Sequence, residues 1–217
     1  MTFTRKIRIK NILQVGGWKL NNMNALSMSK VCSNEEKRLA FVRRIRDIMV
    51  QNQLDGVLIF WAFPNCPDNS AICTNLKLDD RLNVVSLLRE LSQLLKPIGK
   101  LVLFYSSINS VFLTFSAGDV YSPSASFVDY YVLETFKQAG HWSKTIDLST
   151  NLKKMRDNFD LFRRKVDRAV LRKVLIFFDI GSLTFELKIP NAHRIGSGFI
   201  QESQILPEYS PFTDVKF

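Results

Sequence analysis

The chain has 217 residues, of which 46% are apolar and 23% charged, and its 30 Lys and Arg against 20 Asp and Glu give a formal charge of +10. This apolar content excludes intrinsic disorder and collagen-like repeats, because it can supply a sizeable core, and the length favours one domain. No uncharged apolar run of about 18 residues occurs, so we expect no membrane-spanning helix, and residues 1–10 lack the apolar block of a secretory signal.

The first part of the chain predicts strands alternating with helices. Residues 12–15 read Ile-Leu-Gln-Val and lead into Gly16-Gly17, as expected of a short buried strand followed by a turn. The capping box Ser33-Asn-Glu-Glu36, with Ser33 as the cap, predicts the start of an amphipathic helix. Its apolar stripe comprises Leu39, Val42, Ile45 and Met49. Residues 57–63 are continuously apolar, which indicates a strand covered on both faces in a parallel sheet.

The second part continues this alternation. Asp79 and Asp80 can cap a helix whose apolar stripe comprises Val84, Leu88, Leu91 and Leu95. Further strands are expected at 101–105, 127–133 and 174–178, with a long helix over residues 152–170. This order predicts β-α units and a parallel sheet. Because a closed eight-stranded barrel usually needs about 250 residues, the five strands form either an open sheet or part of a barrel.

Four segments carry a family resemblance. Residues 15–18 read Val-Gly-Gly-Trp, and residues 55–64 read Asp-Gly, then Trp and Pro at fixed spacing. Residues 129–140 and 173–187 supply two further motifs. In this order and spacing they resemble strands three, four, six and seven of the family-18 glycoside hydrolases, which include chitinases and chitinase-like lectins.

The resemblance implies an α/β fold of the TIM type, an incomplete β/α barrel with strands three to seven in residues 1–187. It places the first two strands and the eighth outside these 217 residues. Residues 204–209 are weakly similar to the family's small α+β insertion, so residues 188–217 are expected to begin that insertion.

Family-18 hydrolysis, as the resemblance implies it, is substrate-assisted: a Glu at the end of strand four protonates the glycosidic oxygen, and the acetamide of the sugar attacks the anomeric carbon. In this chain the Glu position is Ala62, and the two preceding Asp positions are Phe60 and Leu58. Alternate residues of a strand share one face, so these substitutions predict an apolar pocket floor with no replacement acid nearby.

Other positions of the implied pocket are also changed. The sixth-strand Tyr and Asp are Phe136 and Lys137, and the Met of that strand is Glu134. The seventh-strand Tyr and Arg are Gly181 and Leu183. Loss of a general acid alone typically costs about 10²–10⁴-fold in rate, so we predict a pseudoenzyme without chitinase turnover.

Two tryptophans remain where the family lines its sugar groove. Trp18 and Trp142 could stack on pyranose faces and bind chitin or N-acetylglucosamine oligosaccharides weakly, as in a lectin. In the alternative, both only pack loops at the top of the barrel. Trp61 is expected to point away from the pocket into the core, because its neighbours Phe60 and Ala62 take the other face.

A basic segment supports a function of another class, a scaffold or interaction protein without sugar binding that meets acidic partners through its charge. Its cations either form a solvated helix face or bind such a partner. No nucleic acid is expected, because aromatic residues do not interleave the basic ones. The segment comprises Lys153, Lys154, Arg156, Arg163, Arg164, Lys165, Arg168, Arg172 and Lys173.

No cofactor or metal is predicted. His141 and His193 lack a Cys or acidic partner at ligand spacing. The three cysteines, Cys32, Cys66 and Cys73, are either all free thiols or include a short Cys66–Cys73 disulfide in an oxidising compartment. Secretion is expected only if a longer precursor carries a signal peptide.

Overall fold

The computed structural model describes residues 9–17, 23–61, 64, 79–107, 120–135, 147–148 and 150–177. It divides into two compact units, the first made of Met1–Glu134 and Asn158–Ile176 and the second of Thr135–Asp157 and Phe177–Phe217. Several predictions fall outside the described residues, namely those for Trp18, Ala62, Cys66, Cys73, Phe136, Lys137, His141, Trp142, Gly181, Leu183, His193 and the insertion at 188–217.

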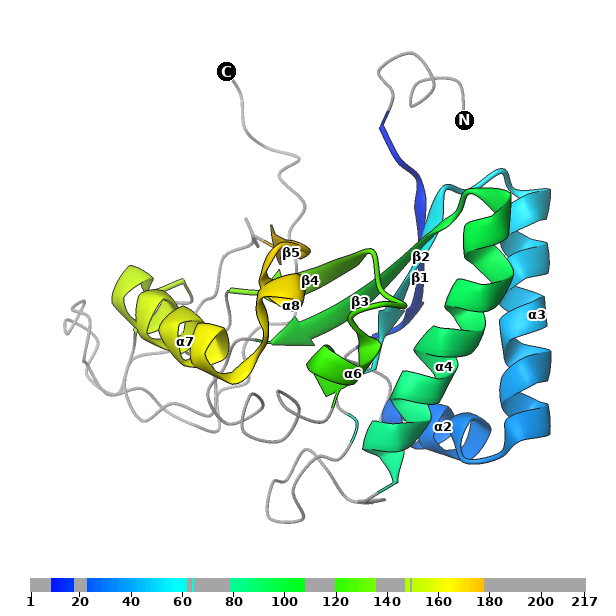
Figure 1. Ribbon diagram of the computed structural model, residues 1–217, viewed down its shortest axis with the longest axis horizontal. Helices are drawn as coiled ribbons and strands as arrows, with labels where there is room; N and C mark the ends of the chain where they lie inside the picture. Colours follow the sequence, from blue (N-terminus) through cyan, green and yellow to red (C-terminus); the bar gives the residue numbers. More distant parts are fainter. Residues whose placement is uncertain are drawn as a thin grey trace, which may run out of the picture. The chain divides into compact units, whose positions relative to one another are not determined.

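Five strands form one sheet in the order β1-β2-β3-β4-β5 (Figure 1). They are β1 (Ile12–Gly16), β2 (Gly56–Phe60), β3 (Leu101–Ser107), β4 (Tyr130–Glu134) and β5 (Val174–Phe177). The pairs β1–β2, β2–β3 and β3–β4 are parallel. Spatial order equal to chain order, with parallel neighbours, is the arrangement of a β/α barrel and differs from a doubly wound sheet, in which the strand order reverses.

Helical segments accompany the strands in the described part of the chain. They are α2 (Met23–Cys32), α3 (Glu35–Gln51), α4 (Asp80–Leu95), the 3₁₀ segment η1 (Lys96–Ile98), α6 (Ser122–Ser124), α7 (Leu152–Lys165) and α8 (Arg168–Leu171). In Figure 1, α2, α3 and α4 lie together beside the first three strands. None of the described helices is long and apolar enough to cross a membrane.

The helix ends differ in detail from the predictions. The cap of α3 is Asn34, whose side chain accepts from the Lys37 amide at 2.9 Å, whereas Ser33 donates its hydroxyl to the Lys30 carbonyl. The predicted long helix is interrupted at Val166, because Asp167 adopts an extended conformation and caps α8 by accepting from the Val170 amide. Helix α2 was not predicted.

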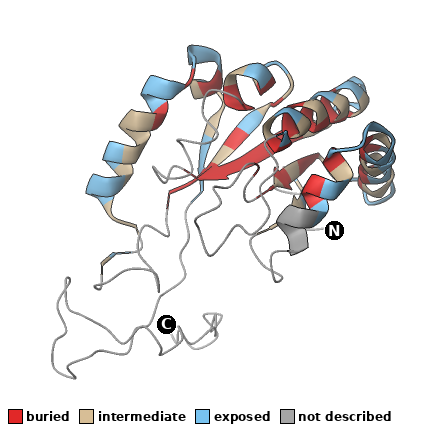
Figure 2. Ribbon diagram, turned by 90° about the horizontal axis from the view of Figure 1, so that it is seen from below, coloured by how far each residue is buried: buried red, intermediate tan, exposed pale blue. Residues whose placement is uncertain are grey.

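The helix-facing core confirms the predicted stripe of α4, since Val84, Leu88, Leu91 and Leu95 are all fully buried. On β2 the alternate residues Val57 and Ile59 are fully buried, and so is Trp61 directly after the strand, so Trp61 lies in the core as expected. Figure 2 shows the buried residues on the central strands and on the adjacent sides of α3 and α4.

A polar cluster links the first three helices. Arg38 of α3 binds Glu90 of α4 with its Nε 2.8 and 2.9 Å from the two carboxylate oxygens, and it also donates to the Cys32 carbonyl at 2.7 Å. Ser29 of α2 donates to Asp80 of α4 at 2.8 Å. Burial raises the pKa of the Cys32 thiol to about 12. Arg38 is thus buried where the amphipathic pattern predicted only apolar contacts.

An aromatic cluster packs between β3, β4 and α7. Tyr121 makes edge contacts with Tyr131 of β4 and Phe162 of α7, with ring centroids 5.3 Å apart in both pairs, and a third with Phe104 of β3. The Tyr131 hydroxyl donates to the Tyr121 carbonyl at 3.0 Å and contacts the Ser124 hydroxyl. Phe104 and Tyr131 are paired in register, so this cluster identifies the helix-facing side of β3 and β4.

Candidate functional site

The carboxyl ends of β1 and β2 approach closely because of two glycines. The Gly17 amide donates to the Phe60 carbonyl at 3.0 Å, and Gly16 and Gly17 have φ values of +93° and +147°. A Cβ atom on Gly16 would lie 2.2 Å from the Phe60 carbonyl oxygen, nearer than any side chain can approach. These glycines therefore bring the two strand ends together at the edge where β/α barrels carry their functional sites.

Phe60 and Tyr105 form the floor at this edge. Their rings are stacked with centroids 3.6 Å apart and planes inclined by 25°. Because Phe104 and Tyr131 face the helices, the next residue, Tyr105, faces the opposite side, which we call the inner face. Leu58 shares this face with Phe60 by the two-residue period of β2. Both side chains are half-buried, and neither can donate a proton.

Glu134, at the end of β4, adds a carboxyl group to the inner face. It is paired in register with Ser107 of β3 and is only 7% exposed. Burial, together with the adjacent Glu134 carboxylate and its hydrogen bond, raises the pKa of Tyr105 far above its usual value. The described part of this face is therefore aromatic with one buried acid, Glu134. The signal in the sequence was the two-residue period of β4, which places Val132 and Glu134 on one face.

The sequence model of the family "Glycosyl hydrolases family 18" matches residues 2–178 of this chain. The chain belongs to this family. Two curated proteins are similar to it. A "chitinase-like effector" of Moniliophthora perniciosa is 26% identical over 137 residues, which are 62% of this chain and 30% of the relative. "Probable chitinase 10" of Drosophila melanogaster is 22% identical over 134 residues, 62% of this chain and 6% of the relative.

Solved family-18 structures share the fold. The group IV chitinase of Ostrinia furnacalis, in complex with allosamidin, matches with a TM-score of 0.74 and 18% identity over 92% of this chain and 54% of that one. An immunomodulatory active chitinase from Trichuris suis matches with a TM-score of 0.73 and 15% identity over 91% of this chain and 54% of that one. The prediction of a TIM-type β/α barrel is confirmed, and the chain spans about half the length of these structures.

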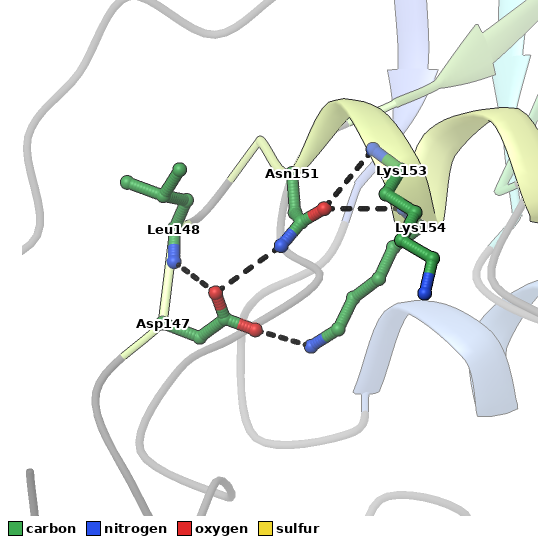
Figure 3. A network of polar contacts seen from close by, with 5 residues as sticks. All are labelled: Asp147, Leu148, Asn151, Lys153 and Lys154. Atoms are coloured by element: carbon green, nitrogen blue, oxygen red, sulfur yellow. Dashed lines mark hydrogen bonds and ion pairs between the residues drawn. The ribbon is translucent and has the colours of Figure 1, made fainter. Parts of the chain in front are cut away.

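The second unit holds the start of the basic segment (Figure 3). Asp147 accepts hydrogen bonds from the Leu148 amide and the Asn151 side chain and forms an ion pair with Lys154. Asn151 in turn accepts from the Lys153 and Lys154 amides, both at 3.1 Å, at the start of α7. The Lys154 hydrogen bond, more than any other contact, holds the pKa of Asp147 below its usual value. The positive charge of Lys154 is therefore paired with Asp147 inside the second unit.

The structure brings together only part of the predicted site. Leu58 and Phe60 lie on one face as predicted, and Glu134 and Tyr105 join them. The proposed sugar-binding residues Trp18 and Trp142 and the degenerate positions Ala62, Phe136 and Lys137 lie outside the described residues. Among the residues that the structure describes, no cluster of three or more His, Cys, Asp or Glu could hold a metal ion.

Proposed function

We propose that this chain is a catalytically inactive chitinase-like protein that binds chitin or N-acetylglucosamine oligosaccharides as a lectin. The main support for the proposed loss of hydrolysis is the stack of Phe60 on Tyr105, with ring centroids 3.6 Å apart, on the inner face of the sheet. In the family resemblance, Phe60 takes the position of an Asp that supports the general acid. The Phe60 ring can neither orient an acetamide by hydrogen bonding nor stabilise positive charge as a carboxylate does.

The neighbouring ionisable groups do not restore the missing proton donor. The raised pKa of Tyr105 makes its phenol a poor acid at neutral pH. Glu134 lies on β4, and β3 separates that strand from β2. Since neighbouring strands lie about 4.8 Å apart, its strand is displaced by roughly 10 Å from the one that carries the family's acid. A proton donor there would not reach the same glycosidic oxygen within hydrogen-bond distance.

Sugar binding is the second part of the proposal. One similar structure, the Ostrinia furnacalis group IV chitinase, holds allosamidin, which supports a carbohydrate ligand in this family. We assign the stacking surfaces to Trp18 and Trp142, because indole rings bind pyranose faces through apolar contact that salt does not screen. We also propose that the protein acts outside the cell if a longer precursor carries a signal peptide.

Retention on chitin beads tests the sugar-binding part. We expect the protein to be retained equally at low and high salt, and Trp18→Ala and Trp142→Ala to be released. The matched control is Tyr130→Ala, which removes an exposed aromatic ring from the start of β4, at the opposite edge of the sheet. Retention that disappears with salt and does not depend on the tryptophans would contradict the lectin assignment.

Turnover is tested separately with chromogenic chitobiose and chitotriose substrates. We expect no product release from the natural chain. Product release that Glu134→Gln abolishes would overturn the proposed loss of activity and would make Glu134 the acid. A variant with Phe60→Asp and Ala62→Glu is also expected to be inactive, because the Tyr105 ring still occupies the inner face beside β2.

A further inference from the structure

A cluster of cations lies where α7 ends and α8 begins, all within the first unit. Phe162, Val166 and Val170 are buried and attach this segment to the core. The residues between them consequently point outward. Four cations in nine consecutive residues have exposed side chains, and we call them the basic turn: Arg164, Lys165, Arg168 and Arg172.

The neighbouring charges do not neutralise the basic turn. Arg163 has its own partner, Asp160, at 3.3 Å. Lys173 turns inward and donates to the Ala125 and Val128 carbonyls at 2.6 and 2.7 Å. Asp167 is the one acid within the turn, and its carboxylate accepts from the Val170 amide at 3.0 Å to cap α8. Within the described ranges, the four cations of the basic turn have no ion pair.

Helix stability does not account for all four cations. Arg164 and Lys165 lie in the last turn of α7, where positive charge stabilises the helix dipole. Arg168, in contrast, begins α8, a segment of only 4 residues whose dipole is too small to account for a charge at either end. Arg172 follows α8 and is exposed. Concentrated like charge in a short segment lowers stability by repulsion, so an anionic partner would stabilise it.

We infer that the basic turn binds an acidic polysaccharide, a glycan that carries sulfate or carboxylate groups at close spacing. Three of its four cations are Arg, whose planar guanidinium binds such oxyanions through paired hydrogen bonds. The inference goes beyond the proposed function, because the ligand is charged and these residues lie apart from the inner face. Membership of a glycoside hydrolase family favours a glycan as the polyanion.

Two other classes of polyanion fit the basic turn less well. Binding to an anionic membrane by an amphipathic helix requires exposed apolar side chains beside the cations, but within residues 162–170 the large apolar side chains, Phe162, Val166 and Val170, are buried. Single-stranded nucleic acid requires exposed aromatic platforms, and residues 163–172 contain no aromatic side chain. Reading of a DNA groove requires a helix or ribbon that enters it, and α8 has only 4 residues.

Fluorescence anisotropy with labelled heparin as the probe tests this inference on the full chain. The test variant replaces Arg164, Lys165, Arg168 and Arg172 with Gln. The control variant makes the same change at four exposed cations of α2 and α3, namely Lys30, Lys37, Arg43 and Arg44, and so lowers the net charge equally. Circular dichroism and urea denaturation verify that both variants are folded.

We expect the test variant to bind heparin about tenfold or more weakly at low salt, with a shallower dependence of affinity on salt concentration. The control variant should stay within about twofold of the natural chain. Equal losses in the two variants would overturn the inference, because they would show that net charge alone is responsible. Tighter binding to a DNA duplex or to phosphatidylserine vesicles than to heparin would overturn it as well. Chitin-bead retention of the test variant should be unchanged, so failure here is distinguishable from failure of the lectin proposal.

Discussion

The ring of Phe60 stacks on the ring of Tyr105, so the ends of β2 and β3 share an aromatic surface where the family resemblance places an acid. Tyr105 extends this contact to β4, because its hydroxyl is hydrogen-bonded to Glu134. The three residues form a continuous row across three neighbouring strands. Because the row joins three neighbouring strands, its contacts should contribute to the stability of the sheet.

Tyr105→Phe removes only the hydroxyl group that meets Glu134. The buried carboxyl would lose a partner, so we expect the free energy of unfolding to fall by about 1–3 kcal/mol in urea denaturation. Tyr130→Phe is the matched control, because Tyr130 is 39% exposed, and it should change stability by less than about 0.5 kcal/mol. A result in which both variants behave alike would show that the Tyr105 hydroxyl contributes nothing to the row.

Arg38→Met breaks the ion pair that links α3 to α4. Both side chains are nearly buried, with exposures of 11% for Arg38 and 14% for Glu90, so the remaining carboxylate would lack a partner charge. We expect a loss of about 3–5 kcal/mol in urea denaturation, and recovery of most of it when Glu90→Leu is added. Arg44→Met, at an exposed position of the same helix, should be nearly neutral. An equal loss in the single and double variants would contradict this account.

Gly16→Ala should perturb the junction of β1 and β2 more than Gly99→Ala perturbs the end of η1. Both glycines have positive φ, but only at Gly16 would the new Cβ meet backbone, at 2.2 Å, whereas nothing lies within 4 Å of a Cβ at Gly99. Gly99→Ala should cost about 1–2 kcal/mol from conformation alone. Thermal unfolding should show a clearly larger loss for Gly16→Ala, and equal shifts in the melting temperature would contradict the predicted clash.

Alkaline pH should destabilise the protein through its buried tyrosines. Burial raises the pKa of Tyr131 to about 12 and those of Tyr105 and Tyr121 further, whereas an unfolded Tyr ionises near 10. The unfolded chain therefore releases these protons first, so this stabilisation is complete below about pH 10 and is lost as pH rises through 12.

Urea denaturation at several alkaline pH values, with phenolate absorbance as a second signal, measures this loss. Tyr131→Phe should flatten the dependence of unfolding free energy on pH between about 10 and 12, because one proton is removed from the linkage. An identical slope for the variant and the natural chain would show that Tyr131 ionises equally in both states.

Local patterns predicted the elements that depend on periodicity. The stripe of α4 and the inward position of Trp61 follow from spacing alone, because the 3.6- and 2-residue periods determine which side chains share a face. The cap at Asn34 and the burial of Arg38 could not be predicted from residue spacing. A side chain such as Arg38 can be buried only when a partner 52 residues away, Glu90, supplies the opposite charge, and no local pattern contains that partner.

The candidate site likewise has one part that local patterns predicted and one part that depended on distant strands. Leu58 and Phe60 could be placed on one face from the sequence, because neighbours in a strand alternate and the family motif identifies the positions. That Tyr105 stacks on Phe60 and that Glu134 joins the row depended on the register of β3 with its two neighbours. The sequence by itself determined the alternation of strands and helices and the family resemblance. Only the tertiary structure decided which distant side chains meet on the inner face, because a register shift of one residue would turn each of them to the other side.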